Sequence, residues 1–94
     1  MPQRLEAPAQ YRIEISGWDA DGKFFVEKTE LSWSEREGKR VSLGKLLRGK
    51  AVVFIRLIQP QTSGTSIPVA YLAEGLAGDA STGKWTYRLT QLHP

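Results

Sequence analysis

The stretch that decides the fold is YRIEIS at residues 11–16, in which apolar and polar side chains alternate strictly. Successive side chains of a strand point to opposite faces of a sheet, so this pattern predicts a half-buried β-strand. The run that follows, GWDADG at residues 17–22, is rich in Asp and Gly and is typical of a hairpin connection. The sequence therefore predicts a β-hairpin near the start of the fold.

Further segments have the composition or alternation of strands, and they cover residues 23–31, 39–43, 51–58, 67–74 and 84–92. The segment 51–58 is the strongest, because it is rich in β-branched and aromatic residues. Phe24 and Phe25 interrupt the alternation of the second strand, so one of them must face outward or lie at a bulge. Residues 32–38 are predicted to form a polar link, and Leu46 and Leu47 an apolar plug within a turn.

Six short strands joined by Gly-rich turns predict an all-β fold, a small six-stranded antiparallel β-barrel whose closure removes exposed strand edges. A chain of 94 residues is long enough for one domain with one modest core. We expect an extended N-terminal arm over residues 1–10 and a single barrel domain over residues 11–94. The predicted core consists of Ile13, Ile15, Val26, Val41, Leu43, Val53, Ile55, Leu57, Val69, Tyr71, Trp85, Tyr87 and Leu89.

The composition argues against catalysis. The absence of cysteine excludes a disulfide framework, a thiolate zinc site and a cysteine nucleophile. The single histidine, His93, lies one residue from the C-terminus, a poor place for a well-held catalytic or metal-binding side chain. The sequence also has no P-loop, no dinucleotide-binding fingerprint and no metal-ligand spacing. We therefore expect a non-enzymatic protein with no catalytic residues, no metal and no cofactor.

The longest apolar run covers residues 51–55 and is far too short to span a bilayer. No targeting segment is visible in the first thirty residues, because charged side chains interrupt every apolar stretch. The expected location is the cytoplasm, and no membrane span is expected.

Positive charge is concentrated in residues 36–50, where six basic residues against one acidic residue give a net charge of +5, compared with +3 for the whole chain. The basic residues are Arg36, Lys39, Arg40, Lys45, Arg48 and Lys50. On one face of a small domain they would attract phosphate groups, whereas pointing in several directions they would be ordinary solvated side chains. With Trp18 or Trp33 as a stacking base, this segment predicts a barrel that binds nucleic acid, which is one of two functional hypotheses.

The three tryptophans have different predicted roles. Trp85 shares a strand face with Tyr87 and Leu89, so we expect it to pack in the core. Trp18 lies in a predicted turn and Trp33 in the predicted polar link. Each of these two could cover an end of the barrel or mark a contact surface, because aromatic residues are enriched at interfaces.

The order of elements resembles a PilZ domain, the small six-stranded barrel of bacterial cyclic di-GMP receptors. The resemblance begins at Arg4, before the first strand, and continues through DADGKF at residues 19–24 and the strand that ends in Thr29. It then follows Gly38, the VSL run at residues 41–43, and the turn that leads to the strand at residues 51–58. Coverage is the whole chain, and the likeness is one of rhythm and turn chemistry.

The resemblance also implies where a nucleotide would bind. Family members that bind cyclic di-GMP have an Arg-x-x-x-Arg arm and a later Asp/Asn-x-Ser-x-x-Gly motif. Arg4 matches the first arginine, but Pro8 stands where the second belongs. Ser34 matches the motif serine, Ser32 replaces the acidic or amide residue, and Gly38 follows one residue late. Residual nucleotide contacts are therefore assigned to Arg4, Ser32, Ser34, Arg36 and Gly38, with cyclic di-GMP binding weak or lost.

The leading functional hypothesis from the sequence is a regulatory or adaptor module that acts through a protein partner.

Overall fold

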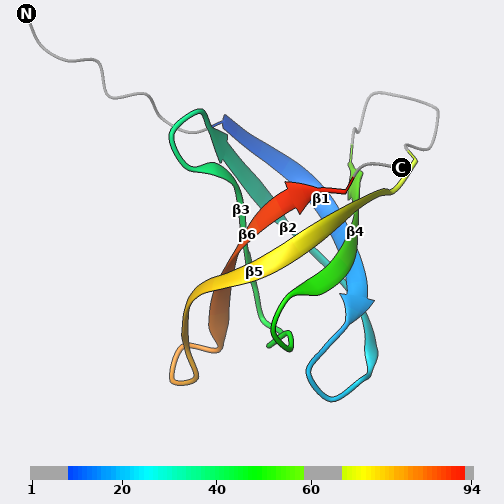
Figure 1. Ribbon diagram of the computed structural model, residues 1–94, viewed down its shortest axis with the longest axis vertical. Helices are drawn as coiled ribbons and strands as arrows, with labels where there is room; N and C mark the ends of the chain where they lie inside the picture. The colour runs from blue at the N-terminus through cyan, green and yellow to red at the C-terminus, as the bar shows by residue number, and fades with distance from the viewer. Residues whose placement is uncertain (1–8, 59–66, 93–94) are drawn as a thin grey trace, which may run out of the picture.

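Six β-strands form a closed antiparallel barrel in a computed structural model of the chain, which describes residues 9–58 and 67–92 (Figure 1). The strands are β1 (Ala9–Trp18), β2 (Phe24–Ser34), β3 (Gly38–Leu43), β4 (Ala51–Leu57), β5 (Val69–Asp79) and β6 (Lys84–Gln91). The described residues contain no helix, and none could therefore cross a membrane as a helix. The predicted all-β, six-stranded barrel is confirmed.

The strands follow the order β1-β2-β3-β6-β5-β4 around the barrel, and pairing of β4 with β1 closes it. Ile15 lies opposite Ile55 at this closing seam. The two ends of the barrel differ in their connections. The β2–β3 turn lies at the end that is uppermost in Figure 1, and the β1–β2, β3–β4 and β5–β6 connections lie at the lower end. We refer to these as the upper and lower ends.

Inward-facing side chains of all six strands form the core. Nine of the predicted core residues are buried, which confirms the alternation on which they were assigned: Ile13, Ile15, Val41, Leu43, Val53, Ile55, Tyr71, Tyr87 and Leu89. Val69 and Trp85 are partly buried and pack against this core. Four buried residues were not predicted, namely Phe25, Leu31, Leu47 and Ala73.

Two predicted core residues are on the surface. Val26 is 55% exposed because Phe25 faces inward opposite Gly17, which turns its neighbours Phe24 and Val26 outward. Of the two adjacent phenylalanines, Phe24 is therefore the outward one, and its ring packs edge-on against Trp18 at 5.2 Å between centroids. Leu57 is 43% exposed because it lies at the last position of β4, at the open upper end of the barrel.

The predicted polar link over residues 32–38 is wrong, because both flanking strands continue into it. β2 runs to Ser34 and β3 begins at Gly38, so only residues 35–37 form the turn. The Ser34 hydroxyl accepts a hydrogen bond from the backbone N–H of Glu37 at 3.1 Å. Gly38 has a φ of 73°, a left-handed conformation that favours glycine over residues with a side chain. The two strands therefore extend, with their outward-facing side chains, to the upper end of the barrel.

Tyr87 fixes the β3–β4 connection to the barrel wall. Its buried phenol oxygen accepts a hydrogen bond from the N–H of Leu47 at 2.8 Å and donates one to the carbonyl of Lys45 at 3.1 Å. Leu47 is buried whereas Leu46 is exposed, so the predicted apolar plug consists of Leu47. Burial raises the pKa of the Tyr87 hydroxyl above its ordinary value, and the hydrogen bond from Leu47 opposes this effect in part.

A bulge interrupts the pairing of β5 with β6 between Gly75 and Ala77. Gly75 is paired with Tyr87, and beyond the bulge Gly78 is paired with Trp85. The Trp85 ring lies directly over Gly78, since a Cβ at that position would overlap Cδ1 of the indole. The bulge and this glycine together let a large indole fold against the lower end of the barrel.

Candidate ligand-binding surfaces

The basic residues of segment 36–50 do not form one patch. Arg36, Lys39 and Arg40 lie at the upper end, whereas Lys45, Arg48 and Lys50 lie beyond the other end of β3 in the connection to β4. Residues 41–43, roughly 10 Å of strand, separate Arg40 from the start of that connection. At the lower end, Arg48 donates a hydrogen bond to the carbonyl of Ala20 at 2.9 Å, which links two connections. This separation gives no support to a single phosphate-binding face.

The predicted nucleotide-contacting residues lie together only in part. Arg4 lies outside the described residues. Ser34 and Gly38 belong to the β2–β3 turn, where the Ser34 hydroxyl is used to hold the backbone of Glu37. Arg36 is exposed at the tip of this turn. Ser32 lies two residues before Ser34 on the outer face of β2, and is paired in register with Arg40 of β3.

Ser32 and Arg40 line a shallow polar depression on the outside of the barrel, which we call the outer groove. Its volume is about 390 Å³, and it is lined by Gln10, Thr29, Glu30, Ser32, Glu37, Arg40, Val41, Ser42 and Thr86. Arg40 contacts Glu37 through Nη1 at 3.4 Å, while its buried Nε has no hydrogen-bond partner among the described residues. On the other side of β3, Arg40 is paired in register with Arg88. Each arginine has a carboxylate beside it, because Glu37 contacts Arg40 and Glu74 of β5 is the register partner of Arg88.

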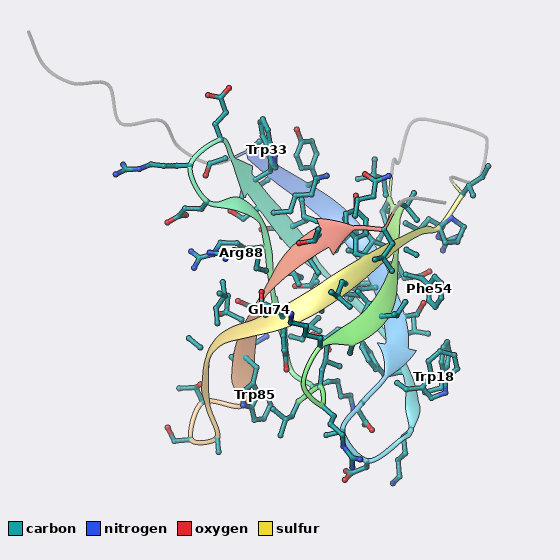
Figure 2. The ribbon with its side chains drawn as sticks, in the orientation of Figure 1. Trp18, Trp33, Phe54, Glu74, Trp85 and Arg88 are labelled. Atoms are coloured by element: carbon teal, nitrogen blue, oxygen red, sulfur yellow. The ribbon has the colours of Figure 1, made fainter. Side chains whose placement is uncertain are left out.

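A second surface on the outside of the barrel is apolar. It consists of Trp18, Phe24, Val26, Val52 and Phe54, and we call it the outer apolar patch. Ser16 lies between Val26 and Phe54 in register, so these side chains extend over three neighbouring strands, β2, β1 and β4. Trp18 and Phe24 are 53% and 58% exposed. Figure 2 shows Trp18 and Phe54 on one side of the barrel and Arg88 on the other.

The upper end of the barrel is hollow, and we call this space the end cavity. It has a volume of about 560 Å³ and is lined by Tyr11, Ile13, Leu31, Trp33, Lys39, Ile55, Leu57, Ile67, Val69 and Tyr71. Trp33 of β2 and Lys39 of β3 are register partners at its rim (Figure 2 labels Trp33). The Lys39 ammonium lies 5.2 Å from the centre of the Tyr71 ring, a cation–π contact.

The described part of the chain contains no cluster of acidic or metal-ligating side chains. Residues 9–58 and 67–92 contain no group of three or more His, Cys, Asp or Glu side chains placed to hold a metal ion. Asp19, in the β1–β2 turn, accepts hydrogen bonds from the N–H groups of Lys23 and Asp21, both at 2.9 Å. The bond from Lys23 contributes most to lowering the pKa of this exposed carboxyl below its ordinary value. Asp19 therefore stabilises the β1–β2 turn through side-chain to backbone hydrogen bonds.

Comparison with known proteins finds no matching family model, no significant match among curated proteins and none among solved structures. A six-stranded barrel alone does not identify a PilZ domain, so that resemblance stays a prediction.

Several residues of these surfaces were not singled out from the sequence. Arg88 lies far from Arg40 in the chain, and only the pairing of β3 with β6 brings the two together. Tyr11 and Tyr71 line the end cavity from strands that are also distant in sequence. Trp33, by contrast, was singled out as a residue that could cover an end of the barrel or mark a contact surface, and it lines the end cavity. Its inward parity with Leu31 was missed because residue 32 was assigned to the link.

Proposed function

We propose that the chain is a non-enzymatic regulatory or adaptor module of PilZ-like type, which acts by binding a protein partner through the outer apolar patch. The single observation that carries this proposal is that three neighbouring strands expose apolar side chains on the outside of the barrel, away from the buried core: Trp18, Phe24, Val26 and Val52. Contiguous exposed apolar surface of this kind marks interaction sites in soluble proteins.

The patch has the composition of an interface centre. Trp and Phe are enriched at the centres of protein interfaces, where they bury much apolar area with little loss of side-chain freedom. Beside the patch, Glu14 and Arg56 form an ion pair at 2.7 Å across the closing seam, and Lys28 is paired in register with Glu14. An apolar centre bordered by charged residues is the usual arrangement of a binding surface with a polar rim.

Site-specific photo-crosslinking in the cells that make the protein tests this proposal without knowledge of the partner. A benzophenone amino acid in place of Phe24 should give a discrete crosslinked product, and the same group in place of Phe54 should give the same product. The matched control is Arg88, an exposed position on the other side of the barrel. If positions 24 and 54 gave no product beyond that from position 88, the outer apolar patch would not be the working surface.

For cyclic di-GMP we propose weak or absent binding. Ser34 is held by the turn and Arg36 stands at its tip, so the outer groove contains only Ser32 of the predicted nucleotide contacts, beside Arg40 of the basic segment. A purine dinucleotide needs several such groups together, because each phosphate contact through an exposed side chain contributes little by itself.

Calorimetric titration with cyclic di-GMP measures this directly. We expect no saturable binding at micromolar concentration for the full chain. Saturable micromolar binding that disappears in Arg36→Ala or Arg40→Ala, and persists in Lys50→Ala at the other end, would overturn the proposal. Lys50 is the matched control because it carries the same charge and lies far from the groove.

A further inference from the structure

The end cavity has the composition of a site for a small molecule. Of the ten lining residues in the described part of the chain, nine are aliphatic or aromatic, and Lys39 is the charged one. Its volume of about 560 Å³ lies within the range of ligand pockets, which are mostly apolar with a few polar groups that orient the ligand. Neither the outer groove nor the outer apolar patch shares this combination.

The shape of the barrel limits how far an occupant can enter. A barrel of six strands is too narrow for an open lumen, so side chains fill its middle. Ile13 and Ile55 are buried and line the cavity, and they form its floor. Tyr11, Trp33 and Leu57 are each about two-fifths exposed around it, so they form its walls and rim. A ligand would therefore insert an apolar body from the upper end and leave its polar end at the rim.

Lys39 defines the polar end of that ligand. Its side chain lies inside the rim against the Tyr71 ring, and it has no ion-pair partner among the described residues. A cation bordering an apolar cavity is electrostatically complementary to an anion on the ligand. Trp33, the register partner of Lys39, provides a flat face beside the same position.

The closed barrel favours a compact ligand over an extended peptide. Peptides commonly bind by adding a strand to a free sheet edge, and every strand of this barrel is paired on both sides. From the apolar lining, the floor and the single cation, we propose that the end cavity binds a small organic carboxylate, with its apolar or aromatic body against Trp33 and Tyr71 and its carboxylate on the Lys39 ammonium.

The test is a titration of the full ¹⁵N-labelled chain with 2-naphthoate, followed by the indole N–H signals of the three tryptophans. The Trp33 signal, assigned with Trp33→Phe, should shift saturably, while the signals of Trp18 and Trp85 stay in place. The neutral analogue 2-naphthalenemethanol should bind about tenfold more weakly, the size of one charge-assisted hydrogen bond.

Variants of Lys39 separate the charge from the fold. Lys39→Met keeps an apolar stem over Tyr71, so it should bring the affinity for naphthoate down to that for the alcohol and leave alcohol binding unchanged. Lys39→Arg should restore the preference for the carboxylate. The proposal fails if the Trp33 signal does not move, if Trp18 or Trp85 moves with it, or if the wild-type chain binds both compounds equally. Because Trp18 belongs to the outer apolar patch, its signal reports binding there, so a shift of Trp33 without a shift of Trp18 tests the end cavity separately from the proposed function.

Discussion

Tyr87 is the residue on which the β3–β4 connection depends most directly. Its hydroxyl both accepts and donates a hydrogen bond in the connection, and Leu47 is buried beside it. In Tyr87→Phe, the buried N–H of Leu47 would lose its partner, so we expect the free energy of unfolding to fall by about 1–3 kcal/mol. Urea denaturation measures this change.

Tyr71→Phe is the matched control for that experiment. Tyr71 is buried in the same core, but no hydrogen bond of its hydroxyl is present among the described residues. Its removal should change the free energy of unfolding by less than about 0.5 kcal/mol, as for substitutions that remove no specific interaction. Equal losses in the two variants would show that the hydroxyl of Tyr87 has no special role in stability.

Tyr87 also gives the barrel a dependence on alkaline pH. Because burial raises the pKa of its hydroxyl above 10.0, the folded chain holds this proton more tightly than the unfolded chain. The contribution to stability is complete below pH 10.0 and decreases as the pH rises from there through the folded-state pKa. Denaturation series across this range should show a steeper loss of stability for the wild type than for Tyr87→Phe. Parallel curves would contradict this assignment.

At the scale of the element, β5 depends on glycine at one position and tolerates a side chain at another. In Gly78→Ala the new methyl would overlap the Trp85 indole, which must then leave its place against the core. Overpacking of this kind costs about 1–3 kcal/mol, so thermal unfolding should begin at a clearly lower temperature.

Gly75→Ala provides the comparison within the same strand. The nearest atom to its Cβ would be Cε1 of Tyr87 at 3.9 Å, an ordinary van der Waals distance. We expect this variant to retain the melting temperature of the wild type to within a few degrees. If both alanines proved equally harmful, the cause would be the bulge itself and not the contact with Trp85.

The sequence could predict the elements well where the alternation is unambiguous. Ile13 and Ile15 are separated by one polar residue, and both are completely buried. The alternation fails at Phe24 and Phe25, because two apolar residues in succession fit either parity and only the pairing of Phe25 with Gly17 decides between them. Val26 was wrongly predicted to be in the core for the same reason, because it faces the side opposite to Phe25.

The binding surfaces could be predicted less well, because they depend on which strands become neighbours. Segment 36–50 has the net positive charge expected from its sequence, but β3 runs along the barrel wall. Its basic residues therefore lie partly at the upper end and partly in the connection at the lower end. The opposition of Arg40 and Arg88 requires β3 to pair with β6, a pairing between segments that are distant in the chain. Local pattern contains no information on such pairings.

At the scale of the whole molecule, closure removes the distinction between edge and central strands. β1 and β4, which would form the two edges of an open sheet, are paired along Ile13–Gly17 with residues 53–57. We therefore expect the amide hydrogens of Ile15 and Ile55 to exchange as slowly as those of Val41 and Tyr87, by global unfolding only. Native-state hydrogen exchange followed by NMR tests this. Exchange at the closing seam that is faster by an order of magnitude would mean that the barrel opens there first.

The three surfaces occupy separate parts of this closed body. The end cavity lies at the upper end. On the wall, β3 and β6 contribute residues to the outer groove and none to the outer apolar patch, whereas β4 contributes to the patch and not to the groove. Only β1 and β2 contribute residues to all three. Substitutions that alter one surface are therefore expected to leave the others intact.

The bulge at Gly75–Ala77 has a consequence for how the length of this chain can vary. In an open sheet, a residue inserted in an edge strand can shift the register of that strand alone. In a closed barrel every strand has two neighbours, so a shift in one register must be compensated in another. In the described strands, the step from Gly75 to Ala77 is where such an offset is already absorbed. We therefore expect insertions and deletions to be tolerated at this bulge and in the turns, and to disrupt folding elsewhere in the strands.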